Sequence, residues 1–432
     1  MNEVDYGVQT PFELPAEPGE HVVRLEMAGY LSQETRVKVQ ADEQVVVHKI
    51  LEKEETPKEG FQITPSLEIT PSEIQIPKPM WHLDVGGVST ATVYEGRVYA
   101  GLGNRLICVK ANTGEVVWDI PLAEEVVGPI LINEGKLYFN GFHNSLYCAD
   151  LSTGSINWSC DGGPFSIFED RIYLGGNSVK CLDKSSGALI WNLKIEDFSY
   201  LFQEAWYELA ATNLKVASGK IFLALRWGGK VACIDARKGT IIWVASPLID
   251  GEDSIYDFIT HQNNLYAHTV KGFVYCLDLE NGASKWQVKL GGGSPVPAQV
   301  YQGKLYIPWS LACLDPSSGT VEWHEGLHIE HPLIFEDSKA FFKFGCVDLH
   351  DGKILWKFDK GGCVYSKPAI YHGRIYGVLD DETLYCLDVN TGEIIWKYEG
   401  IGRVPFDTPM LIENASLYIG STNGLFCFNL EN

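Results

Sequence analysis

The chain has 432 residues, 45% of them hydrophobic and 12% aromatic, which is enough for one large packed domain and a small one. Acidic side chains outnumber basic ones by 56 to 34, and the resulting net charge of -22 disfavours nucleic acid and anionic lipid as partners. No apolar run approaches the roughly 18 residues of a spanning helix, and the first six residues do not look like a signal peptide. We expect a cytoplasmic protein without membrane insertion, or a domain displayed at the cell surface from a longer chain.

The first segment, residues 1–51, contains short alternating stretches separated by turn residues, including Thr10-Pro11, Pro18-Gly19-Glu20-His21 and Gly29-Tyr30. These motifs resemble those of the PEGA domain, which implies a small β-sandwich. The first strand of that family should precede Gly7, and six residues are too few to supply it. We therefore expect Met1 to lie inside a longer natural polypeptide. A trimmed or divergent module is the alternative.

Residues 52–79 are rich in Glu, Lys, Pro, Thr and Ser and contain five prolines. This composition predicts an extended linker rather than a packed element.

The rest of the chain repeats. Eight segments keep the same spacing of Cys, five residues, Gly, three residues and Trp, and successive Trp residues are usually near 40 positions apart. Short apolar runs and turns around this core predict four strands in each unit, the size of a propeller blade. An Asp two residues after most of the cysteines is expected to bond the amides of its own turn, where the Gly supplies a positive φ.

The repeat resembles the tryptophan-docking motif of PQQ-like propellers, Ala-x-Asp-x-x-Thr-Gly-x-x-x-Trp, with Cys in place of Ala, over about residues 81–432. The resemblance implies that each Trp packs on the Gly turn of a neighbouring blade. Lys110 replaces the Asp of the first unit, so that turn should be less well supported. The structural tryptophans are Trp81, Trp118, Trp158, Trp191, Trp243, Trp286, Trp323, Trp356 and Trp396.

The two ends of the repeat array predict the blade count. After Cys427 the last unit stops at Asn432 before any Gly or Trp, whereas Trp81 has no Cys before it. Pairing of the Trp81 strand with the last unit would supply its missing outer strand and close the ring. We therefore predict an all-β fold, a closed propeller of nine four-stranded blades over residues 80–432, preceded by the β-sandwich. The eight blades usual in the family are the alternative.

The cysteines fit packing better than disulfides. Nine of the eleven occupy the same repeat position, and the total is odd. This pattern is consistent with a reducing compartment.

Catalytic motifs are absent. A quinoprotein dehydrogenase generally carries an adjacent Cys-Cys pair, and no two cysteines here are neighbours. The closest cluster of histidines consists of His324, His328 and His331. Their spacing indicates a solvated loop rather than a zinc site. Asp380-Asp381-Glu382 reads as a charged hairpin tip. We predict no metal, no cofactor and no enzymatic activity.

The remaining candidates lie on the face formed by the loops between blades and by the hairpins joining second and third strands. Residues 196–208 hold five aromatics and could anchor a partner or fold over their own blade as a lid. Acidic Asp250, Glu252, Asp253 and Asp257 are expected nearby, and a mixed aromatic and acidic surface suits a protein or peptide. The candidate binding residues are Phe198, Tyr200, Phe202, Trp206, Tyr207, Arg226, Trp227, Trp309 and Arg403.

We therefore predict a non-catalytic interaction or sensor module, the C-terminal part of a multidomain signalling or regulatory protein with an upstream effector domain. One alternative is a scaffold similar to the propeller lipoprotein of outer-membrane assembly, although Cys108, the first cysteine, lies too far along the chain to carry the lipid. A PQQ-dependent dehydrogenase is the less favoured alternative.

Overall fold

The computed structural model describes residues 19–25, 33–39, 78–176, 178–194, 211–225, 229–246, 253–293, 296–329, 331–342, 345–358, 366–405 and 408–431. The chain divides into two compact units, residues 1–74 and 75–432. In the first unit, β1 (Gly19–Leu25) and β2 (Gln33–Val39) form an antiparallel pair. Among the described residues, no helix is long and apolar enough to span a bilayer.

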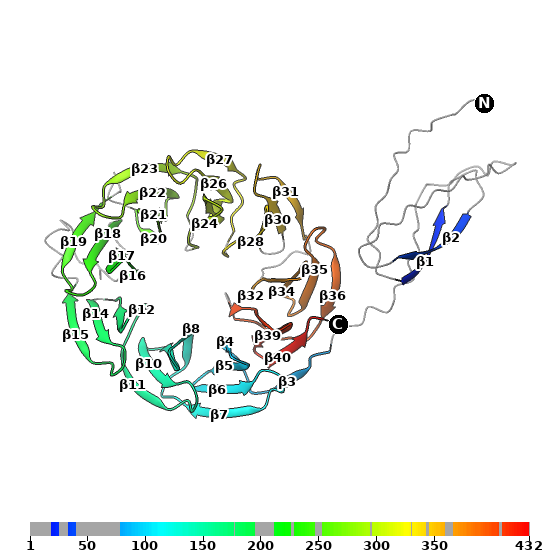
Figure 1. Cartoon of the computed structure of the whole chain (residues 1–432), viewed down its shortest axis with the longest axis horizontal. Helices are drawn as coiled ribbons and strands as arrows, with labels where there is room; N and C mark the ends of the chain where they lie inside the picture. Colours follow the sequence, from blue (N-terminus) through cyan, green and yellow to red (C-terminus); the bar gives the residue numbers. More distant parts are fainter. Residues whose placement is uncertain are drawn as a thin grey trace. The chain divides into compact units, whose positions relative to one another are not determined.

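The second unit is a ring of nine four-stranded antiparallel sheets, each running from an inner strand near the axis to an outer strand at the rim (Figure 1). Nine blades confirm the predicted count, and the eight-bladed alternative is wrong. In chain order, the first four blades are β4 (Thr90–Tyr94), β5 (Arg97–Leu102), β6 (Arg105–Lys110), β7 (Val116–Pro121); β8 (Val126–Asn133), β9 (Lys136–Gly141), β10 (Ser145–Asp150), β11 (Ile156–Asp161); β12 (Phe165–Phe168), β13 (Arg171–Leu174), β14 (Ser178–Asp183), β15 (Leu189–Lys194); and β16 (Ala211–Ala217), β17 (Lys220–Leu225), β18 (Lys230–Asp235), β19 (Ile241–Ala245).

The next four blades have the same order of strands. They are β20 (Ile255–His261), β21 (Asn264–Thr269), β22 (Phe273–Asp278), β23 (Ser284–Lys289); β24 (Gln299–Tyr301), β25 (Lys304–Ile307), β26 (Ala312–Leu314), β27 (Val321–His324); β28 (Ile334–Glu336), β29 (Lys339–Phe342), β30 (Gly345–Asp348), β31 (Ile354–Lys357); and β33 (Ala369–Tyr371), β34 (Arg374–Val378), β35 (Leu384–Asp388), β36 (Ile394–Tyr398). A short 3₁₀ turn, η2 (Pro308–Ser310), joins β25 to β26.

The ninth blade is built from both ends of the unit. Its strands are β38 (Leu411–Glu413), β39 (Ser416–Ser421), β40 (Gly424–Asn429) and, at the rim, β3 (Trp81–Leu83). The pairing of Trp81 with Cys427 places β3 where the other blades have their own last strand. Two short segments near the axis, β32 (Ser366–Lys367) and β37 (Thr408–Pro409), pair in parallel between the last two blades.

Each blade carries the same row of three side chains across its second, third and fourth strands. In the first blade Tyr99 pairs with Cys108, and Cys108 pairs with Trp118, so all three lie on one face of the sheet. The two ring centroids are 5.9 Å apart, which leaves the cysteine covered between them. A Tyr or Phe occupies the first position of this row in every blade. The sequence signal for this aromatic is weak because the hairpin between the second and third strands varies in length.

The tryptophan of each row packs on the next blade, as the family resemblance implies. A Cβ built on Gly282 would lie 2.7 Å from the Trp243 ring, and the Trp243 Nε1 donates to the Leu279 carbonyl at 3.3 Å. Eight junctions have this arrangement of ring and glycine. The hydrophobic core therefore lies between the blades, in clusters that combine residues of two neighbouring sheets.

In most blades the turn before the outer strand is built as the repeat predicts. In the sixth blade, Asp315 Oδ1 accepts bonds from the amides of Ser317 and Ser318, both at 2.9 Å. These bonds and the serine hydroxyls favour the carboxylate and lower the pKa of Asp315 to about 2. In the first blade the backbone bond from Gly114 to the Lys110 carbonyl remains, but Lys110 offers no carboxylate to the turn.

Candidate functional site

Most of the predicted binding residues lie outside the described part of the chain. These include the aromatic segment at 196–208 and the predicted neighbours at 226–227, 250 and 252. Of the residues predicted to lie on this face, the structure describes Trp309, Arg403, Asp253 and Asp257. The residues left untested are Phe198, Tyr200, Phe202, Trp206, Tyr207, Arg226 and Trp227.

Trp309 is not available as a contact residue. It lies in η2 at the predicted end of its blade, but only 2% of its surface is exposed. Its ring packs beside His268, with centroids 6.1 Å apart. The sequence expectation of a surface Trp is wrong here because the 3₁₀ turn folds the indole into the core shared with the preceding blade.

Arg403 is exposed, with its Nε 3.9 Å from a Glu382 carboxylate oxygen. Glu382 belongs to the tip of the β34–β35 hairpin, where Asp381 accepts bonds from the Thr383 amide and the Tyr385 hydroxyl. The acidic run therefore builds a hairpin tip, and its link to Arg403 is a solvent-exposed ion pair of small energetic value.

The two described acidic residues of the predicted surface are buried and accept hydrogen bonds, one within its own blade and one from the neighbouring blade. Asp253 accepts the amides of Ser254 and Lys271, which ties the loop before the fifth blade to its β21–β22 hairpin. Asp257 bonds the side-chain amide of Asn213 in the neighbouring blade, and burial raises its pKa. Neither carboxylate is presented as a surface charge.

The three histidines lie in different environments. His324 bonds Ser310 at 2.7 Å, His328 is exposed and His331 is fully buried. Within the described ranges, no three His, Cys, Asp or Glu side chains are grouped closely enough to hold a metal ion.

The row cysteines are inert packing residues. Their side chains are fully buried, and burial raises the pKa of Cys233, Cys313 and Cys386 to about 12. A thiol held protonated beneath two aromatic rings is a poor nucleophile and a poor metal ligand.

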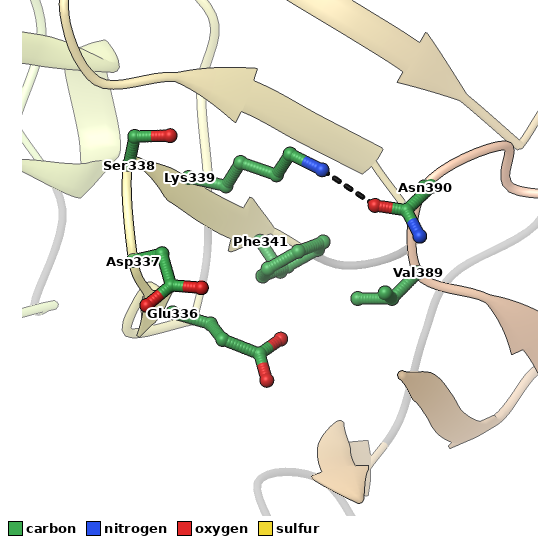
Figure 2. A pocket seen from close by; sticks show the side chains of 7 residues that line it. All are labelled: Glu336, Asp337, Ser338, Lys339, Phe341, Val389 and Asn390. Carbon is green, nitrogen blue, oxygen red and sulfur yellow. Dashed lines mark hydrogen bonds between the residues drawn. The ribbon is translucent and has the colours of Figure 1, made fainter. Parts of the chain in front are cut away.

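A hollow of about 350 Å³ lies between the seventh and eighth blades (Figure 2). The β28–β29 hairpin supplies the carboxylates of Glu336 and Asp337 on one side, while Phe341 and Val389 form an apolar floor. Hairpins joining first and second strands emerge at the opposite end of the blades from the predicted face, because the connections of an antiparallel meander alternate between its two ends. Sequence reasoning missed this location.

The hollow is bounded by a bond between blades. Lys339 Nζ donates to Asn390 Oδ1 at 2.6 Å, across the junction (Figure 2). The first residue of the second strand makes a similar bond to the next turn at three other junctions: Lys136 to Ser185, Arg171 to Arg237 and Lys220 to Glu280. We call these bonds basic latches. The sequence signal was a Lys or Arg at this position in seven of the nine units: Arg97, Lys136, Arg171, Lys220, Lys304, Lys339 and Arg374.

A family model described as outer membrane protein assembly factor BamB matches residues 78–287, 175–332 and 310–424, which together span most of the chain. The chain belongs to this family of PQQ-like propellers. The PEGA domain model matches residues 1–55, which confirms the resemblance of the first segment to that domain. A comparison with curated proteins finds no match.

Several solved structures share the fold. Quinohemoprotein alcohol dehydrogenase from Comamonas testosteroni has 12% identity and a TM-score of 0.53, with 82% of this chain and 76% of that chain covered. A europium-containing methanol dehydrogenase has 13% identity and a TM-score of 0.52, with 80% and 85% covered. The computationally designed Ika8 protein has 12% identity and a TM-score of 0.51, with 81% and 98% covered. At these low identities the similarity shows that this chain shares the propeller fold of the three structures. It does not show that the chain shares their activity.

Proposed function

We propose that this chain is a non-catalytic protein-interaction module that takes a basic side chain of its partner in the hollow between the seventh and eighth blades. The observation that carries the proposal is the pair of carboxylates of Glu336 and Asp337 beside a hollow between two blades. The charged end of a Lys or Arg side chain can enter the hollow and bind these carboxylates.

The charge of the whole chain supports the same class of partner. A net charge of -22 attracts basic proteins over a Debye length and raises their encounter rate. The latch from Lys339 to Asn390 fixes the two blades that form the hollow, so little ordering is required on binding.

A comparison of variants tests the proposal. The propeller and its Glu336→Gln/Asp337→Asn double variant would each be immobilised, and proteins captured from an extract of the native cells would be quantified by mass spectrometry. We expect a discrete set of proteins to lose at least tenfold in recovery with the double variant. Glu95→Gln, at the matching hairpin position of the first blade, is the control and should keep that set. Equal recovery with all three proteins would reject the hollow as the contact site.

The wider role is also proposed. The PEGA domain that precedes the propeller in the sequence supports a sensor or regulatory module within a multidomain cytoplasmic or surface-displayed protein. Intact mass spectrometry of the endogenous polypeptide tests this, since an upstream effector domain requires a mass above 48.1 kDa. A scaffold role like that of the outer-membrane assembly propeller remains the alternative, and it requires no effector domain.

We propose that the chain is not a dehydrogenase, and the missing Cys-Cys pair supports this view. Purified protein supplied with pyrroloquinoline quinone and Ca²⁺ should reduce no dye with methanol or ethanol as substrate. Alcohol-dependent dye reduction would overturn the non-catalytic proposal.

A further inference from the structure

The rim of the propeller carries the outer strands of the blades, and one edge of each faces away from its sheet (Figure 1). Such an edge presents unpaired backbone donors and acceptors and can accept a further strand. In natural proteins, lysines on an edge strand often prevent the pairing of a further strand. The outer strands of this ring differ in how many lysines they carry.

The third and fifth blades form a matched pair. Immediately before its Trp, the outer strand β23 of the fifth blade carries Ser284 and Lys285, and Lys289 closes it. At the same two positions, the outer strand β15 of the third blade carries Leu189 and Ile190, which are 57% and 46% exposed. Among the described residues, no neighbouring blade covers Leu189 or Ile190, so both side chains are free to contact a partner.

The charge of this edge identifies the partner. Lys194 is exposed at the end of β15, and Lys180 lies opposite Asn192 in the register of β14 and β15. Neither lysine makes an ion pair with the described residues. Lys194 is the one charged side chain of β15. The strand therefore complements a segment that combines apolar and acidic side chains.

We propose that the free edge of β15 accepts an extended, acidic and apolar segment of a partner protein as a fifth strand of the third blade. Backbone bonds along the six residues of β15 would hold the segment, with its apolar side chains against Leu189 and Ile190 and a carboxylate at Lys194. This surface is separate from the hollow between the seventh and eighth blades, so the two proposals fail independently.

A second copy of the chain fits this edge poorly. Antiparallel pairing of β15 with itself brings Leu189 opposite Lys194 and supplies no carboxylate for either lysine. Each copy also brings a charge of -22.

The test uses the fluorescein-labelled hexapeptide Glu-Thr-Ser-Thr-Val-Val, titrated with the full chain at low salt and followed by anisotropy. In antiparallel pairing its valines lie against Ile190 and Leu189, and its glutamate lies against Lys194. We expect saturable binding that weakens about tenfold in Leu189→Ser/Ile190→Lys, which removes two apolar cross-strand contacts. This variant carries the residue pair of the fifth blade, which already folds in the same setting. The converse variant, Ser284→Leu/Lys285→Ile, should add a second binding site.

Three results would overturn the proposal. The first is unchanged affinity in Leu189→Ser/Ile190→Lys despite an unchanged melting temperature. The second is equal binding of the same hexapeptide with lysine in place of its glutamate, and the third is a concentration-dependent dimer in sedimentation that the variant abolishes. The dimer would make a second copy the occupant. Glu336→Gln/Asp337→Asn should keep full affinity for the peptide, which separates failure here from failure of the proposed function.

Discussion

The junctions between blades are of two kinds, and their difference shows what the ring requires. At eight junctions a Trp ring lies on a Gly turn. Between the eighth and ninth blades, Trp396 has no such glycine, because the last unit of the sequence contains none after Cys427. Trp396 is nevertheless only 7% exposed, as buried as Trp323 at a regular junction.

Aromatic packing replaces the glycine turn at that irregular junction. Phe428 occupies a position that is Val, Ala, Leu or Ile in the other blades, and its ring meets Tyr398 edge to face with centroids 5.1 Å apart. Phe426 stacks beside Phe428 in the same cluster, which also holds Trp396 and Leu430. The ring therefore requires each Trp to be covered, and either a turn or a group of aromatic side chains can do so.

The largest expected effect comes from removing a ring at a regular junction. Trp243→Ala should lower the free energy of unfolding by about 3–5 kcal/mol, because it leaves a cavity against Gly282 and removes a hydrogen bond to Leu279. Guanidinium unfolding followed by circular dichroism measures this. Val116→Ser, at an exposed rim position, is the control and should stay near the wild type. A loss below about 1 kcal/mol would mean that the junction does not depend on the ring.

Adding a methyl group to the glycine should cost somewhat less. Gly282 has φ of +73°, and a Cβ there would approach the Trp243 ring to 2.7 Å. Gly282→Ala should therefore destabilise by about 2–4 kcal/mol, from backbone conformation and overpacking together. Gly303→Ala separates the two causes, since Gly303 has φ of +75° with no atom within 4 Å of its Cβ position. Equal losses for both variants would contradict the role of ring contact.

The irregular junction should respond to a smaller change. Phe428→Leu introduces the residue that several other blades carry at this position, yet it should cost about 1–2 kcal/mol because the contacts with Tyr398 and Phe426 are lost. Phe273→Leu, a half-buried ring in the fifth blade, should cost less under the same denaturant titration. A neutral Phe428→Leu would indicate that the aromatic cluster is not what covers Trp396.

The smallest effect is expected at the turns and depends on pH. Because the pKa of Asp315 falls from 3.8 to about 2 on folding, its carboxylate stabilises the fold above about pH 4 and loses this effect as pH falls towards 2. Asp315→Asn should therefore lower the melting temperature slightly at pH 6 and not at pH 2. Lys110→Asp should raise it at pH 6 by supplying the missing carboxylate of the first blade. The same difference from wild type at both pH values would contradict this assignment.

The sequence predicted the parts of this molecule that depend on contacts repeated in every unit. The spacing from Cys to Gly to Trp determines one turn, one bulged strand pair and one ring contact, and these are sufficient to specify a blade and its neighbour. The partnership of Trp81 with Cys427 followed because each end lacks what the other supplies.

Features that depend on contacts outside the repeat motif were not predictable in this way. Whether Trp309 lies on the surface or in the core depends on how a 3₁₀ turn meets the preceding blade, and the hollow at Glu336 exists only because another blade lies beside its hairpin. The Lys or Arg of each basic latch can be recognised in the sequence because it occupies the same position in most repeats. The residue that accepts its hydrogen bond cannot, because it differs from one turn to the next. The spacing of the repeat residues by itself determined the nine blades and their closure, because these depend on contacts that recur in every unit. Which surface residues are exposed was decided by the tertiary structure, because exposure depends on neighbouring segments that the repeat does not encode.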